Sequence, residues 1–502
     1  MSETADYKIK NMKSKRICVL GAGNAGLMAA LILKSERPGL DVYVVGSSEI
    51  GIVGVGESST EHVNYFRNLL GISVKDFVVE CGCTFKYGVD FQGWTDKRYI
   101  HSLISNGDGI NSGPYHTEPE ELFMYTNMSA DCEPTDLSPP HHLKYEVQSE
   151  DAFPNQFHFD TQKLNKFLIK RLERLNIKFY DDTITDILVS EWGDVEAIES
   201  DTTRYEADIF VDATGFKRLI ANSVPGFNFK SRQKDMFVDS AFAFQCPHDE
   251  PDNYPTFTQA IKMDAGWMWR IPTSERMGNG YAYSSKHITY DEAVREVHRK
   301  LGFKPKIGKT FKFEAGNYER TWVGNTVLIG LSSHFYEPLE ATAIGVGIQQ
   351  ARILANYINS SHASKETYNV IIQDLFEQVF AFVRLHYVNC KVDTPFWQDV
   401  NNTLLPVEVK KYLDITRERV LLLEDVGNRS GAVVTENRIF GAHNWNQVLY
   451  ALGFLSKEVL EDHVKAYGHT SRLRPHTEDF ETIPHKQLID KWNNINENST
   501  SN

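Results

Sequence analysis

Cysteine is scarce in this chain, which has six in 502 residues and no pair in CxxC spacing. This excludes a disulfide framework and a CxxC-type zinc site, and it indicates free thiols in a reducing compartment. Long apolar runs are also missing, because the uncharged stretch from Ile17 to Leu33 is short and interrupted by glycines. The first sixteen residues are polar and lysine-rich, so they predict a flexible tail and no signal peptide. We expect a cytoplasmic protein without a membrane span or a metal.

Basic residues are the minority, since 53 Lys and Arg against 67 Asp and Glu give a net charge of −14. Such a balance disfavours nucleic acid as a partner. Hydrophobic residues make up 41% and charged residues 24%, as in ordinary globular proteins. At this length the chain is expected to form two or three packed modules.

The N-terminal region predicts a βαβ unit. The apolar run Ile17–Leu20 indicates a strand, Leu27–Leu33 a helix and Asp41–Val45 a second strand. Between the first strand and the helix lies GAGNAG, which has the GxGxxG spacing of a dinucleotide site. The backbone N–H groups at the start of such a helix attract phosphate.

The glycines of this turn have separate tasks. Typically the first permits a tight turn, the second lets the backbone approach a pyrophosphate, and the third allows close helix packing. The acidic residue that often holds the ribose would fall at Gly46, so the sequence leaves the ribose contact open. The predicted cofactor-binding turn consists of Gly21, Gly23, Asn24, Ala25 and Gly26.

Two later segments favour FAD over a nicotinamide cofactor. Ala207–Gly215 indicates a buried strand that ends in Thr214 and Gly215, and Thr326–Gly330 indicates another that leads to a helix over Ala343–Tyr357. FAD monooxygenase-type folds return to the nucleotide with such late elements, and the chain resembles them. The expected fold class is α/β, a doubly wound Rossmann-type FAD domain with an inserted antiparallel substrate sheet and a helical C-terminal region.

The expected domain limits follow from this pattern. Short alternating stretches between Ala241 and Ser285 predict strands of the inserted sheet, and apolar residues at helical spacing beyond Glu366 predict helices. We therefore expect a flexible tail at 1–16, the FAD domain at 17–365 with its insert at about 225–315, a helical substrate-covering region at 366–475, and a frayed tail at 476–502.

The stretch Gly266–Pro272 reads GWMWRIP. Trp267, Trp269 and Ile271 are spaced by two and therefore share one strand face, and Pro272 ends the strand or places it at an edge. By spacing alone, two buried core tryptophans are the favoured interpretation.

This stretch also resembles the WxWxIP signature of the flavin-dependent tryptophan halogenase family. Further stretches are similar to family motifs and follow in the family's order between about residues 17 and 450. These stretches are Gly54–Ser59, Phe85–Gly88, Arg276–Ser284, Glu337–Ala343 and Asp393–Trp397.

The resemblance implies an enzyme that uses reduced FAD, dioxygen and halide to make hypohalous acid, which then halogenates an electron-rich aromatic ring. It assigns halogen transfer to Lys86, either through a hydrogen bond to the halogen species or through a haloamine. On periodicity alone, Lys86 would be a solvent-facing residue opposite Phe85 and Tyr87. The resemblance gives Glu340 the task of stabilising the cationic ring and removing its proton, whereas its position alone indicates a helix-start acid.

The resemblance also implies contacts to the flavin and the halide. Ala341 and Ala343 stand where the family has serine and glycine, and we hypothesise that this more apolar pocket favours bromide or iodide over chloride. The residues expected beside the flavin, in addition to the glycine turn, Thr214 and Gly215, are Gly54, Glu57, Ser58 and Gly330, together with Thr342 and Ala343, which are also expected to bind halide.

The substrate pocket is expected behind a wall formed by Trp267 and Trp269, with Ile271 and Pro272 beside them. His101 matches the family residue that holds the aromatic ring, but Leu103 replaces its aromatic partner. The region 426–442 lacks the tyrosine pair and acid that bind the amino-acid end of tryptophan. A phenol, an indole or a larger aromatic is therefore expected more than free tryptophan.

Two other functions compete with this one. An FAD-dependent aromatic monooxygenase would share the nucleotide-binding core, and a flavoprotein without catalysis would serve as a binding module. No nicotinamide site is evident, so a separate flavin reductase is the expected partner, and a homo-oligomer is possible.

Overall fold

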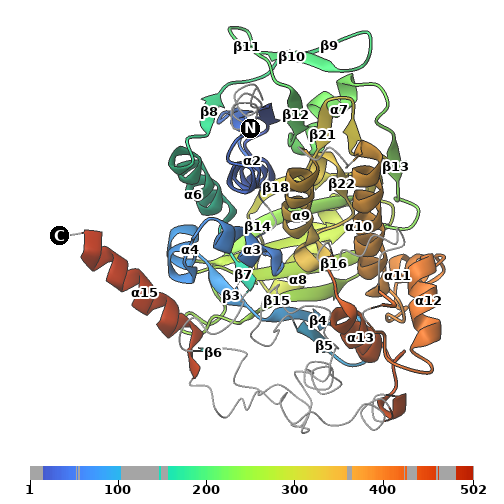
Figure 1. Ribbon diagram of the computed structural model, residues 1–502. Helices are drawn as coiled ribbons and strands as arrows, with labels where there is room; N and C mark the ends of the chain where they lie inside the picture. Colours follow the sequence, from blue (N-terminus) through green and yellow to red (C-terminus); the bar gives the residue numbers. More distant parts are fainter. Residues whose placement is uncertain are drawn as a thin grey trace.

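The computed structural model describes residues 15–52, 54, 57–102, 146–148, 156–358, 364–422, 424–426, 438–459, 462 and 482–500 (Figure 1). Leu103, most of the tail expected at 1–16, and the stretch 427–437 lie outside these residues. Within the described part of the chain, no helix is long and apolar enough to cross a membrane.

A six-stranded sheet forms the nucleotide-binding half of the molecule. Its order is β20 (Trp322–Val323), β21 (Thr326–Leu328), β12 (Ile209–Asp212), β1 (Arg16–Leu20), β2 (Asp41–Gly46) and β8 (Lys178–Asp181). All neighbours are parallel except the edge pair β20 and β21. Apolar side chains of β1 and β12 point to both faces and are buried, as in sheets covered by helices on both sides.

Helices cover this sheet where the βαβ pattern predicts them. In Figure 1, α2 (Asn24–Glu36) lies between α6 (Thr161–Arg174) and α9 (Thr342–Tyr357). Nearly all of α2 from Gly26 to Leu33 is buried, because it is apolar on every side and packs against both helices and the sheet. The expected doubly wound α/β fold is confirmed.

A seven-stranded sheet forms the second half. Its order is β18 (Ile307–Lys312), β14 (Ser240–Cys246), β17 (Met277–Tyr283), β16 (Gly266–Pro272), β15 (Phe257–Met263), β4 (Gly88–Gln92) and β5 (Tyr99–Ser102). Five strands lie inside the segment expected at 225–315. The last two strands come from much earlier in the chain, and β4 pairs in parallel with β15. The insert therefore completes a sheet that the N-terminal segment has begun.

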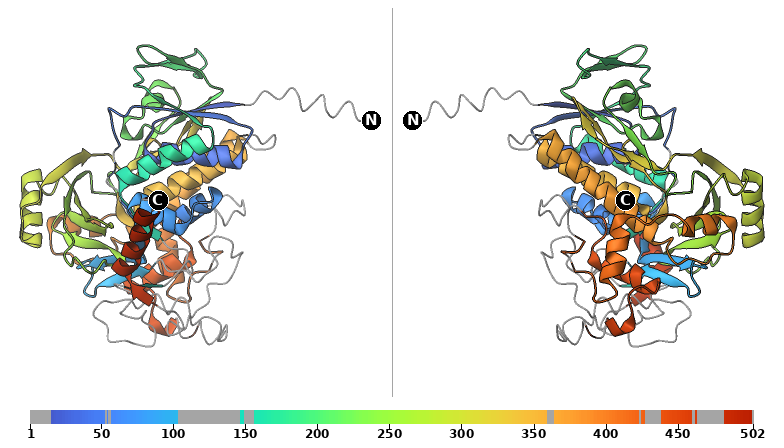
Figure 2. Two further views of the ribbon diagram at one scale, coloured as in Figure 1. Left: turned by 90° about the vertical axis from the view of Figure 1, so that its left-hand side faces the viewer. Right: turned by 90° about the vertical axis from the view of Figure 1, so that its right-hand side faces the viewer.

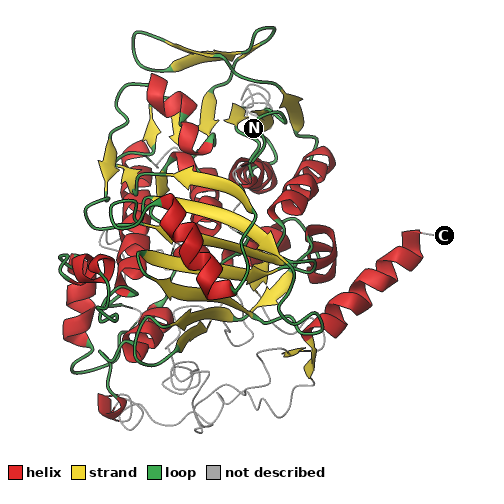
Figure 3. Ribbon diagram, turned by 180° about the vertical axis from the view of Figure 1, so that it is seen from behind, coloured by secondary structure: helices red, strands yellow, loops and turns green. Residues whose placement is uncertain are grey.

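The outer face of this sheet is covered by α8 (Tyr290–Leu301), which the sequence analysis did not anticipate. Ala293 and Val297 pack against Phe242, Met268 and Tyr281, and Figure 3 shows the helix crossing the strands. The helix begins with a capping box of Thr289 and Glu292 and ends at Gly302 in the left-handed region.

The helical region lies beside α9, at the opposite end of the molecule from the small sheet of β9 (Asp186–Val189), β10 (Val195–Glu199) and β11 (Arg204–Tyr205) (Figures 1 and 2). It contains α10 (Lys365–Leu385), α11 (Pro395–Asn401), α12 (Val407–Ile415) and α13 (Ala442–Ala451). The apolar face expected on α10 is buried, including Phe376, Val379, Phe380 and Val383.

The remaining elements are short. The short helices are α3 (His62–Leu69), α4 (Val74–Cys81) and α7 (Leu219–Ser223). Two strand pairs are formed by β3 (Thr84–Lys86) with β7 (Gln156–His158) and by β6 (Glu146–Gln148) with β23 (Thr482–Pro484). One three-stranded sheet contains β9 (Asp186–Val189), β10 (Val195–Glu199) and β11 (Arg204–Tyr205), and another contains β13 (Phe229–Ser231), β19 (Gly316–Tyr318) and β22 (His334–Phe335).

The expectation of a frayed tail at 476–502 is wrong for its second half, where α15 covers His485–Thr500. The first part of this helix is anchored, since His485 is fully buried and its Nε2 accepts a hydrogen bond of 2.9 Å from the Phe85 N–H. Leu488 and Ile489 are also buried, and the Trp492 ring contacts the Phe85 ring edge-on at 5.9 Å. Because most residues of this segment are polar, the sequence pattern did not indicate the few apolar residues that anchor it. Figure 1 shows the rest of α15 extending away from the body.

Candidate active site

The glycine turn between β1 and α2 is shaped to receive a phosphate group. Gly21 has a φ of +115°, and a Cβ there would lie 2.3 Å from the carbonyl oxygen of Ala213. A Cβ on Gly26 would lie 2.0 Å from the carbonyl oxygen of Gly21, so this glycine lets the helix pack close to the turn. A Cβ on Gly23 would meet nothing within 4 Å, which leaves space for a ligand at the helix N-terminus.

Two neighbours of the turn explain how it is supported. The Asn24 side chain faces α6, where its Nδ2 donates to the carbonyl oxygen of Thr161 at 3.4 Å and its Oδ1 accepts from Asn165 at 3.1 Å. Only the backbone of Asn24 is therefore left for a ligand. Gly46 packs against the turn, because a Cβ there would lie 2.5 Å from the Cβ of Ala22. No acidic side chain can stand at this position without moving the turn.

The two late segments meet at the same end of the sheet. The Thr214 hydroxyl donates to Oδ1 of the buried Asp212 at 2.7 Å, and the Ser332 hydroxyl donates to the same oxygen at 3.0 Å. A Cβ on Gly330 would lie 2.8 Å from the Cβ of Ala25, so this segment touches the glycine turn. Thr214, Gly215 and Gly330 are thereby brought to the turn, as the FAD interpretation requires.

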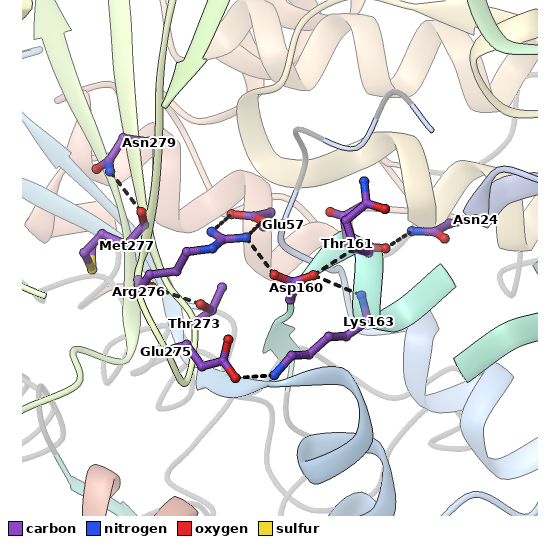
Figure 4. A network of polar contacts seen from close by, with 11 residues as sticks. Asn24, Glu57, Asp160, Thr161, Lys163, Thr273, Glu275, Arg276, Met277 and Asn279 are labelled. Carbon is purple, nitrogen blue, oxygen red and sulfur yellow. Dashed lines mark hydrogen bonds and ion pairs between the residues drawn. The ribbon is translucent and has the colours of Figure 1, made fainter. Parts of the chain in front are cut away.

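Glu57 is directed towards protein groups (Figure 4). The Arg276 guanidinium donates to its two oxygens at 2.6 and 3.0 Å and to Asp160 at 2.7 Å. Asp160 also accepts from the N–H groups of Gln162 and Lys163 and so caps α6. Through Arg276, the Glu57 carboxylate connects its own loop with the hairpin of β16 and β17 and with α6. It is therefore not directed at a ligand.

Ser58 and Gly54, in the same loop as Glu57, have different surroundings. The Ser58 hydroxyl is buried and has no hydrogen-bond partner among the described residues, so it is a free group for a ligand. Gly54 has a φ of +40°, and a Cβ there would lie 2.8 Å from Cγ2 of Thr161.

Lys86 is buried, with 1% of its surface exposed. The expected single strand is interrupted at Tyr87, so that Lys86 ends β3 while Val89 lies on β4 in another sheet. The solvent-facing position that periodicity alone indicated is therefore wrong. Its Nζ donates to the carbonyl oxygen of Ser59 at 3.1 Å. Burial lowers the pKa of Lys86 to about 8, although the charge of Glu340 opposes this shift.

Glu340 is also buried and stands in a strained backbone, with a φ of +61° followed by +53° at Ala341. Its Oε1 lies 2.9 Å from Nδ1 of His101 and 3.2 Å from Nε2 of His386. Burial alone would raise the pKa of Glu340, but the two histidines outweigh it and hold the pKa well below its usual range. The carboxylate is ionised in the interior.

The other acid of the same motif behaves in the opposite way. Burial raises the pKa of Glu337 to about 8, and the Tyr387 hydroxyl lies 2.8 Å from its Oε2. Three positions apart, the pKa of one carboxyl group is raised and the pKa of the other is lowered. Environments that separate two carboxyl groups in this way are typical of acid–base sites.

Helix α9 starts at Thr342, two residues after Glu340, so the N–H groups of Thr342 and Ala343 lie in its first turn. Thr342 is buried. The N-cap residue is Ala341, whose side chain cannot cap the helix, and this leaves these N–H groups able to hold an anion.

Trp267, Trp269 and Ile271 share the inner face of β16, whereas Met268 packs on the outer face under α8. The Trp269 ring lies on Gly280, where a Cβ would come within 2.0 Å of the ring. The two tryptophan rings are 6.0 Å apart. Pro272 is the last residue of β16, which is a central strand, so it ends the strand and marks no sheet edge.

A narrow cavity reaches Glu340 from the side of α3 and α13. Its lining residues are Thr60, Glu61, Gln156, Glu340, Ile439, Phe440 and Asn444. His101 stands behind this lining, and its ring lies 6.3 Å from Phe440. The cavity combines one aromatic wall with two carboxyl groups and two amides.

Several of these residues were not predicted. His386 lies directly after the last turn of the apolar helix α10, and Asn444 lies in the first turn of α13, where an asparagine is an ordinary helix-start residue. No spacing in the sequence connects either one with Glu340, because the contacts join segments that are far apart. Tyr99, whose hydroxyl lies 3.2 Å from Nδ1 of His386, was also not predicted as part of the site.

Comparisons with known proteins agree with this geometry. A family profile described as tryptophan halogenase matches residues 16–466. The tryptophan 7-halogenase RebH of Lentzea aerocolonigenes is 30% identical over 438 residues, which cover 81% of this chain and 82% of RebH.

Solved structures show the same fold. A tryptophan halogenase from Shewanella frigidimarina superposes with a TM-score of 0.81 at 20% identity, covering 96% of this chain and 98% of that one. Xcc4156, a flavin-dependent halogenase from Xanthomonas campestris, gives a TM-score of 0.77 at 25% identity, with 95% and 98% covered. On these grounds the chain belongs to the tryptophan halogenase family of flavin-dependent oxidoreductases.

Proposed function

We propose that this enzyme halogenates an electron-rich aromatic substrate, with Lys86 as the residue that presents the halogen and Glu340 as the proton acceptor. The observation that carries this proposal is the burial of one amine and one ionised carboxylate from distant parts of the chain, close enough that the charge of Glu340 opposes the lowering of the Lys86 pKa. Burying charged groups costs free energy, so a buried pair of this kind indicates a functional site.

Reduced FAD, with dioxygen and a halide ion, would supply hypohalous acid, and a separate flavin reductase would supply the reduced FAD. The glycine cradle and the free Ser58 hydroxyl fit such a cofactor. The α9 N-terminus would hold the halide and the polar edge of the flavin. The residues proposed to hold the cofactor are Gly21, Gly23, Asn24, Ala25, Gly26, Gly54, Ser58, Thr214, Gly215, Gly330, Thr342 and Ala343, with Glu57 acting through its ion pair.

Lys86 and Glu340 act on different steps of one aromatic substitution. The Lys86 ammonium donates a hydrogen bond to the oxygen of hypohalous acid, and ring electrons form the carbon–halogen bond as the halogen–oxygen bond breaks. The oxygen takes a proton from Lys86 and leaves as water. Glu340 accepts the proton of the ring C–H bond, whose electrons restore aromaticity. One proton is given and one is taken, so the net charge of the pair does not change, and each side chain regains its own charge once the proton passes from Glu340 back to Lys86.

The first prediction concerns Lys86. Lys86→Ala, incubated with a reductase, NADH, FAD, bromide and a panel of aromatics, will consume reduced flavin at the wild-type rate and lose brominated product by at least about a hundredfold, because the halogen has no donor. Mass spectrometry and oxygen uptake measure the two. Lys286→Ala, at an exposed lysine, is the matched control. A hydroxylated product without halogen from the wild-type enzyme would instead support the monooxygenase.

The second prediction distinguishes the two possible tasks of the Lys86 nitrogen. If the ammonium is the donor, product formed per hypohalous acid is steady below pH 8 and falls as the pH rises through the pKa of about 8. A haloamine route needs the neutral amine and would rise over the same interval. The amount of hypohalous acid formed at each pH is measured in parallel reactions with a small-molecule hypohalite trap. We expect the fall, and a rise would exclude the donor mechanism.

The third prediction concerns the halide. Ala341 and Ala343 carry no hydroxyl that could solvate a small anion, so the site at the α9 N-terminus is expected to prefer a larger, weakly hydrated halide. Product yields measured with equal chloride, bromide and iodide should be several-fold higher with bromide or iodide. A clear chloride preference would contradict this proposal, and Ala341→Ser should move the ratio towards chloride.

The fourth prediction concerns the substrate. Glu61 lines the cavity, and burial raises the pKa of its carboxyl group to about 7. Among the described residues no charged or hydrogen-bonding side chain contributes to this shift, and burial alone accounts for it. A substrate amine would supply the missing partner, so we propose an indole or phenol that carries an amine. Several relatives are named as tryptophan halogenases, which agrees with an indole ring.

A substrate panel tests this assignment. At pH 8, kcat/KM should be at least about tenfold higher for tryptamine than for indole-3-propionate, and Glu61→Gln should remove most of this difference, since hydrogen bonds to charged groups contribute about 1.5–3 kcal/mol. Free tryptophan, which carries both charges, should fall between them. Equal kcat/KM values for the two probes with the wild-type enzyme would show that Glu61 does not recognise the substrate amine.

A further inference from the structure

The two histidines beside Glu340 are each held by a second group. His101 Nδ1 faces Glu340 Oε1 at 2.9 Å, and its Nε2 faces Nδ2 of Asn444 at 3.0 Å. The orientation of the Asn444 amide is fixed, because its Oδ1 accepts from the Gly441 N–H at 2.9 Å at the start of α13. Nδ2 of Asn444 must then donate to His101, so the His101 proton sits on Nδ1 and points at Glu340.

His386 carries its proton on the other nitrogen. Its Nε2 lies 3.2 Å from Glu340 Oε1 without forming a hydrogen bond, and a lone pair this close to an ionised carboxylate oxygen would be repelled. The Nδ1 atom is therefore the acceptor, and the Tyr99 hydroxyl donates to it at 3.2 Å. The ring plane is fixed by stacking on Phe91, with centroids 4.5 Å apart and planes within 8°. Burial also lowers the pKa of His386, which favours the neutral ring.

We propose that His101 and His386 are positioning residues, locked by Asn444 and Tyr99 as two opposite neutral tautomers. The His101 Nδ1–H donates to Oε1 of Glu340, the His386 Nε2–H lies 3.2 Å from the same oxygen without forming a hydrogen bond, and Oε2 is left as the free proton acceptor. This inference rests on the proposed function. It adds to it which oxygen takes the proton and why the carboxylate keeps its charge.

The free oxygen supports this assignment. Glu340 Oε2 is buried and has no hydrogen-bond partner among the described residues, while Glu340 itself lines the narrow cavity. An unpaired buried carboxylate oxygen costs free energy unless a ligand or reaction uses it. Neutral histidines stabilise the negative charge without offering a proton to Oε2, whereas an imidazolium could protonate the carboxylate and remove its acceptor.

A metal ion is the rival interpretation of this cluster. Single ligand atoms of His101, Glu340 and His386 lie within 4.8 Å of one another. A metal would need the Nδ1 lone pair of His101, however, and the donation from Asn444 to Nε2 leaves Nδ1 as the protonated atom. The fixed amide therefore favours the hydrogen-bonded arrangement.

Paired variants test the lock through catalysis. His386→Leu should lower the kcat for halogenated product by about a hundredfold with KM and flavin consumption nearly unchanged, because the base is misaligned. His386→Gln, whose amide N–H can replace Nε2–H, should recover at least about tenfold of this loss. Tyr99→Phe should lower kcat several-fold. Tyr336→Phe removes a buried hydroxyl that is bonded to Asn317 outside the cluster and serves as the matched control.

A spectroscopic measurement tests the tautomers directly. In protein labelled with ¹⁵N-histidine, and with signals assigned by His101→Gln and His386→Gln, long-range ¹H–¹⁵N spectra should show a neutral Nδ1–H ring for His101 and a neutral Nε2–H ring for His386. Asn444→Asp, which replaces the donor by an acceptor, should convert His101 to the imidazolium or to the other tautomer and lower kcat.

The outcomes separate the lock from the proposed function. Loss of product in Glu340→Gln but full kcat in His386→Leu would overturn the lock alone, as would a stoichiometric metal in the purified enzyme or identical tautomers of the two rings. Absence of any halogenated product from the wild-type enzyme would overturn the proposed function, while the tautomers would still report whether the arrangement exists.

Discussion

The interior of this enzyme has to keep two opposite charges ionised without letting them meet water or neutralise each other. An ammonium and a carboxylate lose most of their hydration when buried, and the loss is tolerable only if fixed dipoles replace the water. A backbone carbonyl does this for Lys86. For Glu340, the His101 imidazole provides a hydrogen bond and the His386 imidazole lies 3.2 Å from the same oxygen. The sheets, the strained turn before α9 and the start of α13 can all be understood as supports for these few hydrogen bonds.

The nucleotide-binding half could be predicted because its signals are local. A buried strand, three glycines and an apolar helix lie within about twenty residues, and backbone sterics leave few alternatives for such a run. The same reasoning placed the tryptophans on one face of β16, since alternation along a strand is a property of the chain itself. Local signals also identified α10.

The carboxylate network could not be predicted in this way. His101, Glu340, His386 and Asn444 are separated by up to 343 positions and meet only through tertiary packing. Periodicity also misplaced Lys86, because the strand changes sheets at Tyr87 and the alternation rule holds only within one sheet. The predicted role of Glu57 shows a related limit, since its partner Arg276 comes from a hairpin 219 positions later. Resemblance identified the residue types, while geometry alone shows their partners.

The anchoring of Phe85 by His485 has a consequence for biosynthesis. These residues are 400 positions apart, and the hydrogen bond between them holds the short strand whose last residue is Lys86. During translation the strand must wait for the helix that secures it, so a growing chain can complete its nucleotide fold long before its reactive amine is enclosed.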